Sequence, residues 1–70
     1  MKINTIKFLN LDDEIINLDL VKKDEEFLIQ LRKENYTSNV KRFIYDESIA
    51  INIFVNHVKT LENNSDLRRI

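Results

Sequence analysis

The chain of 70 residues contains no cysteine, no glycine, no proline and no tryptophan, and it has a single histidine. Without cysteine it forms no disulfide and builds no cysteine-based metal site. Without glycine it lacks the loops that bring backbone N–H groups close to a phosphate, and it also lacks the glycine that an EF-hand calcium loop requires. The absence of glycine and proline further argues against a disordered linker, which is usually rich in one of them.

Long hydrophobic runs are also missing. The longest apolar stretches contain three residues, such as Ile49–Ile51 and Ile53–Val55. No segment approaches the roughly 20 residues that a membrane span needs. The first ten residues have neither the apolar run nor the cleavage site of a secretory signal. We therefore expect a cytoplasmic protein with no membrane partner.

The overall composition is that of an ordinary soluble domain, with 43% hydrophobic residues, 33% charged residues and a net charge of −1. A chain of this length forms one small domain that buries only about 60% of its unfolded surface. We expect residues 1–62 to form that domain and residues 63–70 to be a polar tail that frays, with Leu67 and Ile70 as its only apolar anchors. Ile, Asn and Lys supply 26 of the 70 residues. Their AT-rich codons suggest a low-GC bacterium or one of its mobile elements.

Period-two alternation of apolar and polar residues marks the first half of the chain. This spacing is typical of half-buried strands. It predicts strands over residues 14–22 and 25–33, and a weaker one over 3–9, separated by turns rich in Asn, Asp and Lys. The residues that face the core are then Ile16, Leu18, Leu20, Phe27, Ile29 and Leu31.

Two segments of the chain permit more than one interpretation. Residues 24–34 are largely good helix formers, and a helix there would place Phe27, Leu28 and Leu31 on one face. An all-α fold is therefore the alternative. Thr37–Asn39 offers a helix N-cap before Val40, but the same segment also suits a fourth strand.

The last third of the chain predicts an amphipathic helix over residues 48–62. Asp46 or Ser48 is expected to be its N-cap, with Glu47 in the first turn. Helical spacing groups the apolar stripe as Ala50, Ile51, Phe54, Val58 and Leu61, opposite Asn52, Asn56 and Lys59. The predicted fold class is therefore α+β, with a small antiparallel meander of three or four strands packed by this C-terminal helix.

The sequence offers no catalytic constellation. His57 is alone at the edge of the helical stripe, and no second histidine or cysteine exists to share a metal ion. None of the serines lies in a nucleophile-elbow motif, so no triad is expected. We predict no catalytic residue, no metal site, no cofactor and no enzymatic activity.

Acidic residues gather in the middle of the sequence. Residues 12–34 hold eight acidic and four basic side chains. Such a surface docks on a basic partner by charge complementarity. The candidate partner-binding acids are Asp12, Asp13, Glu14, Asp24, Glu25 and Glu26.

A second candidate surface lies on the predicted helix. Ile49 and Ile53 fall off the main apolar stripe and close to Asn56. If uncovered, they form an apolar spot of the kind that docks a partner protein or pairs two copies of the chain.

A small basic and aromatic cluster suggests nucleic-acid binding as the alternative. Lys41 and Arg42 lie near Tyr45, and single-strand binders interleave such residues. So few cations neutralise few phosphates, which limits affinity.

The sequence therefore predicts a non-enzymatic protein-binding module, an inhibitor or modulator of a host enzyme or defence complex encoded by a phage or other mobile element. The alternative is a small dimeric DNA-binding regulator or antitoxin.

Overall fold

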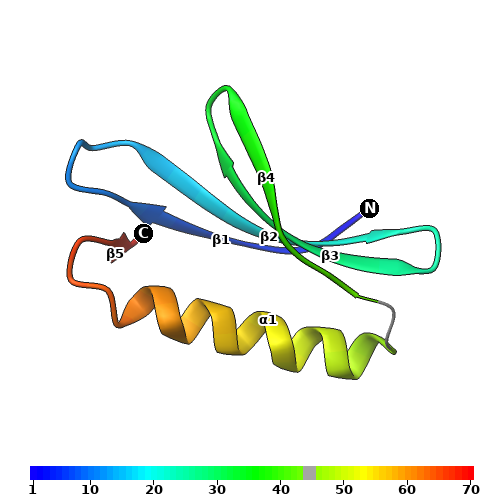
Figure 1. The fold of residues 1–70 in the computed structure, drawn as a ribbon. Helices are drawn as coiled ribbons and strands as arrows, with labels where there is room; N and C mark the ends of the chain where they lie inside the picture. Colours follow the sequence, from blue (N-terminus) through cyan, green and yellow to red (C-terminus); the bar gives the residue numbers. More distant parts are fainter. Residues whose placement is uncertain (44–45) are drawn as a thin grey trace.

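A computed structural model describes the backbone of residues 1–43 and 46–70, and the side chains of residues 1–40 and 46–70. The elements follow the order β1 (Lys2–Leu9), β2 (Ile15–Lys23), β3 (Glu26–Lys33), β4 (Tyr36–Phe43), α1 (Glu47–Glu62) and β5 (Arg68–Arg69). The strands form one antiparallel sheet in the order β4-β3-β2-β1-β5 (Figure 1). The predicted α+β meander with a C-terminal helix is confirmed, and the all-α alternative is wrong.

The third and fourth strands resolve the two ambiguous segments. Residues 26–33 are β3, which pairs with β2 on one edge and β4 on the other, so tertiary pairing overrides the weak helix propensity of these residues. Thr37–Asn39 lies inside β4 and caps no helix. The predicted fourth strand therefore exists, although it begins at Tyr36, before the apolar residues that suggested it.

Asparagine and aspartate shape the turns that glycine usually provides. In the β1–β2 loop, the Asn10 side-chain oxygen accepts hydrogen bonds from the backbone N–H groups of Asp12 and Glu14, both at 2.9 Å. Asp13 has φ 60° and Asp24, in the turn between β2 and β3, has φ 56°. This left-handed region suits glycine best, and Asp tolerates it better than most other residues.

The helix begins where the sequence indicated. Asp46 is the N-cap, and the Ile49 N–H donates to its carboxylate at 2.9 Å. Ala50, Phe54 and Val58 form the buried stripe. Ile51, which the spacing placed in that stripe, is instead 41% exposed because it lies on the flank of the helix.

The core lies between α1 and one face of the sheet. Phe8, Leu18, Leu20, Phe27 and Ile29 from the strands pack with Ala50, Phe54 and Val58 from the helix. The molecule is therefore a two-layer structure in which one sheet face is covered by α1 and the other is not (Figure 1). Within the described residues, no helix is long and apolar enough to cross a membrane.

The C-terminal segment, which the sequence predicted to be a polar tail, contacts the rest of the chain. Arg68 and Arg69 pair with Leu9 and Phe8 of β1, and the Ile70 N–H donates to the Lys7 carbonyl at 3.1 Å. Leu67 packs against the core as predicted, whereas Ile70 is 57% exposed.

Candidate functional site

The acidic residues singled out in the sequence do not form one surface. Asp12, Asp13 and Glu14 lie in the loop before β2, whereas Asp24, Glu25 and Glu26 follow its last residue. Because β2 is an extended strand of nine residues, the two groups lie at opposite ends of the sheet (Figure 1). A partner that contacted both groups of acids would have to reach both ends of the sheet, and the prediction that these acids bind a partner stays a prediction.

The fold brings a different acid to one of these ends. Glu34, from the turn between β3 and β4, lines the same shallow depression as Asp13 and Glu14, together with Lys7. In the part of the chain that the structure describes, no group of three His, Asp or Glu side chains is arranged to hold a metal ion. These carboxylates are consistent with solvated turn residues.

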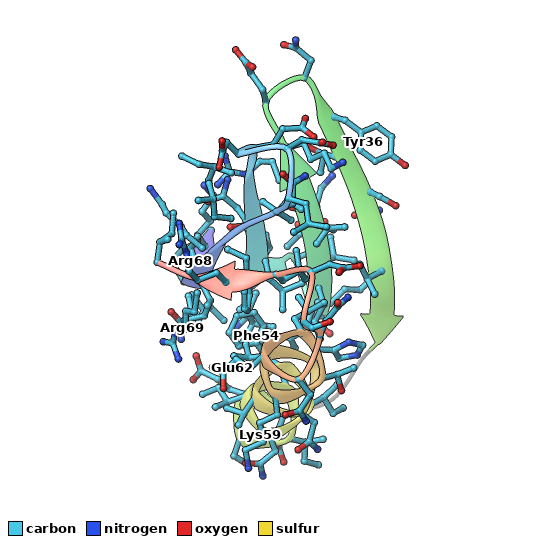
Figure 2. All side chains as sticks on the ribbon, turned by 90° about the vertical axis from the view of Figure 1, so that its left-hand side faces the viewer. Tyr36, Phe54, Lys59, Glu62, Arg68 and Arg69 are labelled. Carbon is cyan, nitrogen blue, oxygen red and sulfur yellow. The ribbon has the colours of Figure 1, made fainter. Side chains whose placement is uncertain are left out.

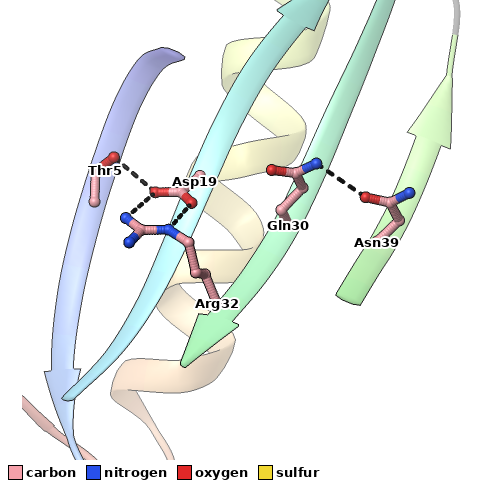
Figure 3. A network of polar contacts seen from close by, with 5 residues as sticks. All are labelled: Thr5, Asp19, Gln30, Arg32 and Asn39. Carbon is pink, nitrogen blue, oxygen red and sulfur yellow. Dashed lines mark hydrogen bonds and ion pairs between the residues drawn. The ribbon is translucent and has the colours of Figure 1, made fainter. Parts of the chain in front are cut away.

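A row of polar side chains crosses the sheet face that α1 leaves uncovered (Figure 3). Its members stand directly opposite one another in the register of β1 to β4: Thr5, Asp19, Gln30 and Asn39. The Thr5 hydroxyl donates to Asp19 Oδ1 at 2.7 Å, and the Gln30 amide donates to Asn39 Oδ1 at 3.0 Å.

Asp19 is the centre of this row and is fully buried, with 0% exposed. Arg32, two residues after Gln30 on β3, donates from Nε to Asp19 Oδ2 at 3.0 Å and from Nη2 to Oδ1 at 3.4 Å. Burial raises the pKa of Asp19, but the hydrogen bonds from Arg32 and Thr5 outweigh it, and the net pKa lies below its ordinary value. The same hydrogen bond raises the pKa of Arg32. A buried, partnered carboxylate of this kind is suited to fixing strand register and is poorly placed to meet a substrate.

His57 lies half-buried on one flank of α1. A shallow depression there is lined by Ile53, Asn56, His57 and Thr60. None of these neighbours is a carboxylate that could orient or polarise the imidazole ring, as an acid–base histidine requires. The depression therefore offers no catalytic arrangement.

The predicted apolar spot on the helix is only partly formed. Ile49 is 43% exposed, and Ile53 follows it by one helical turn on the same flank. Ile53, however, packs against the core cluster, so it is only partly available to a partner. Asn56 is exposed beside it.

The opposite flank of α1 carries an apolar pair that sequence reasoning missed. Ile51 and Val55 are each 41% exposed and lie one turn apart. Val55 borders a groove between the helix and the first strand, whose other lining residues are Asn4, Ile6, Phe54, Val58, Lys59, Glu62 and Arg69. Figure 2 shows Glu62 and Arg69 together at this side of the molecule, with Phe54 between the helix and the sheet. The spacing of Val55 after Ile51 was the available signal, but assigning Ile51 to the core hid it.

An open strand edge borders the same groove. β5 pairs only with Phe8 and Leu9, so the outer edge of β1 from Lys2 to Ile6 has no strand partner among the described residues.

The nucleic-acid candidates cannot be placed. Lys41 and Arg42 belong to β4, but their side chains lie outside the described residues, as does the whole of Tyr45. Comparison with protein-family models, with curated proteins and with solved structures finds no match for this chain. Its function is therefore inferred from its own surface.

Proposed function

We propose that this protein is a non-enzymatic binding module that acts by occupying a surface of another protein. In its concrete form it is an inhibitor or modulator of a host enzyme or defence complex, encoded by a mobile element. The observation that carries the proposal is the exposed apolar pair Ile51 and Val55, of which Val55 borders the groove between α1 and β1.

Neither helix propensity nor core packing explains why Ile51 and Val55 occupy exposed positions of α1. β-branched residues are poorer helix formers than the Ala, Lys or Glu that suit an exposed helix position. The core of α1 is already supplied by Ala50, Phe54 and Val58. Exposed apolar side chains that border a groove are typical of surfaces that contact another chain.

The rest of the surface supports a binding role over a catalytic one. The depressions on the described surface are open to solvent, whereas active sites usually sit in well-formed pockets with convergent polar groups. Asp19, the one buried acid among the residues that the structure describes, is already paired with Arg32.

Affinity capture from a low-GC bacterial host tests the proposal. Tagged wild-type protein is expected to retain one host protein in stoichiometric amount, and the double variant Ile51→Glu/Val55→Glu is expected to lose it. Thr60→Glu is the matched control, because Thr60 is exposed on the opposite flank of α1. A blank capture, combined with a shift of promoter DNA in low salt, would overturn the proposal in favour of a DNA-binding regulator.

A further inference from the structure

We propose that α1 pairs in antiparallel orientation with the α1 of a second copy of this chain, through the flank that carries Ile49 and Ile53. This flank lies opposite Ile51 and Val55, so the inference goes beyond the proposed function and does not depend on it. It is argued from the spacing, the shape and the charge of the flank.

The residues of this flank have the spacing of a helix-pairing seam. We define the α1 seam as four residues that follow one another at intervals of four, three and four positions: Ile49, Ile53, Asn56 and Thr60. Alternating steps of three and four keep one stripe of a helix against a neighbouring helix, as in a coiled coil. Because α1 forms a layer of its own beside the sheet (Figure 1), the exposed members of the seam are accessible to a second helix.

The α1 seam holds both a projecting side chain and a depression that can receive it. The depression is lined by residues i, i+3, i+4 and i+7 of the helix, namely Ile53, Asn56, His57 and Thr60. Four residues in this arrangement form the hole that takes one side chain of a facing helix. Ile49 is exposed one helical turn before the hole and is the side chain that fits it.

Antiparallel pairing about a two-fold axis near Ile53 uses both features twice. Position 49 lies as far before this axis as the centre of the hole lies after it. Ile49 of each copy therefore enters the hole of the other, and the two Ile53 side chains meet at the axis. A two-fold interface requires one self-complementary patch of this kind. Parallel pairing would set Ile49 beside its own copy and away from the hole.

The charge along α1 fits the same pairing. From Ser48 to Val58 the helix has no Asp, Glu, Lys or Arg, in a chain with 33% charged residues. Antiparallel pairing stacks these uncharged segments and brings Asp46 of each copy to the level of Lys59 of the other, so opposite charges are neighbours. The two Asp46 residues lie about 20 Å apart along the helix axis. That separation exceeds the screening length of roughly 10 Å at 0.1 M salt, so like charges do not oppose the pairing.

Sedimentation equilibrium tests the inference. The wild type is expected to show a concentration-dependent equilibrium between monomer and dimer. Ile49→Glu is expected to raise the dissociation constant at least tenfold, because it places a carboxylate in an apolar contact. The variant should stay folded, since an acid in the first turn of a helix is favourable, and far-UV circular dichroism checks this. Ile51→Glu is the matched control, because positions 49 and 51 are 43% and 41% exposed on opposite flanks. It is expected to stay within twofold of the wild type.

Disulfide cross-linking tests the register, since the chain has no cysteine of its own. A mixture of Ile49→Cys and Asn56→Cys is expected to form a disulfide between unlike chains in higher yield than either variant forms alone. The reason is that position 49 of one copy lies next to position 56 of the other. A higher yield from Ile49→Cys alone would indicate parallel pairing and would overturn the inference.

The remaining outcomes separate this inference from the proposed function. A monomer at every concentration, or equal weakening by Ile49→Glu and Ile51→Glu, would overturn the pairing. Ile51→Glu/Val55→Glu is expected to lose the captured host protein and remain a dimer. Thr60→Glu, which places a carboxylate at the level of Asp46 of the second copy, is expected to weaken the dimer and keep the host protein. Loss of capture with an intact dimer therefore concerns only the proposed function, and the reverse concerns only the pairing.

Discussion

At the scale of single residues, Asp19 is the most constrained polar group of the described structure. Its carboxylate is removed from solvent yet accepts hydrogen bonds from Arg32 and Thr5. Removing one partner of such a buried pair leaves a charge without compensation, which is far more costly than replacing both. Asp19 therefore couples β1, β2 and β3 at one point of the sheet.

This coupling predicts a pH dependence of stability. The folded-state pKa of Asp19 is lowered, so its contribution is fully present above the unfolded value of about 3.9. It is lost as the pH falls through the lower folded value, because only the charged carboxylate keeps these hydrogen bonds. Urea denaturation between pH 6 and pH 2 is expected to show a shallower acid loss of stability in Asp19→Asn than in the wild type.

Thr5→Val provides the graded control, since it removes one of the hydrogen bonds to Asp19 and keeps the ion pair with Arg32. Its loss of unfolding free energy between pH 6 and pH 2 should fall between those of the wild type and Asp19→Asn. If Asp19→Asn lost as much unfolding free energy as the wild type over this range, the lowered pKa assigned to Asp19 would be contradicted.

At the scale of elements, the turns show that a chain without glycine places aspartate at left-handed backbone positions. Asp24 holds a left-handed φ of 56° in the turn between β2 and β3. Glycine adopts this conformation without the Cβ clash that other residues suffer. We expect Asp24→Gly to stabilise the protein by up to about 1 kcal/mol, measured by urea denaturation.

The neighbouring turn residue gives the matched control. Glu25 is not among the residues with positive φ, so Glu25→Gly only adds freedom to the unfolded chain and is expected to destabilise. A loss of stability in Asp24→Gly comparable to that in Glu25→Gly would show that the left-handed backbone is not the limiting feature.

Elements with a regular pattern were predictable from the sequence, and those that depend on distant contacts were not. The alternation around Leu18 and Ile29 identified β2 and β3, and the cap at Asp46 located the start of α1. The exposure of Ile51 was missed because helical spacing shows which residues share an apolar face, but does not show how much of that face the sheet covers. β5 was missed because two residues carry no period, and their partner in β1 lies about 60 positions away.

The candidate site was less predictable than the fold. Charge counting along the chain grouped Asp12 with Asp24, but an antiparallel strand between them carries them to opposite ends. The groove between α1 and β1 depends on how the helix docks on the sheet, and that is a property of tertiary structure. Sequence spacing alone could identify only its helical half.

At the scale of the whole molecule, stability depends on the packing of α1 against the sheet. Phe54 is 2% exposed and joins α1 to the sheet core. Phe54→Ala is expected to cost about 3–5 kcal/mol, against a total of about 4–10 kcal/mol for a chain of this length. Thermal denaturation should therefore show a variant that is largely unfolded or melts far below the wild type.

Val55→Ala is the control for Phe54→Ala, because it shortens the next residue of the same helix on its exposed flank. It is expected to change the stability by less than about 0.5 kcal/mol. A harmless Phe54→Ala would mean that the helix does not pack as described.

The up-and-down order of the first four strands also governs how the chain reaches this structure. Each of β1, β2 and β3 pairs with the strand that follows it, so each hairpin closes over a short connection and loses little loop entropy. Long-range closure is confined to two events, the docking of α1 and the return of β5 to β1. Topologies dominated by local pairing fold quickly. We therefore expect the folding barrier to lie where the helix and the last strand meet a sheet that has already formed.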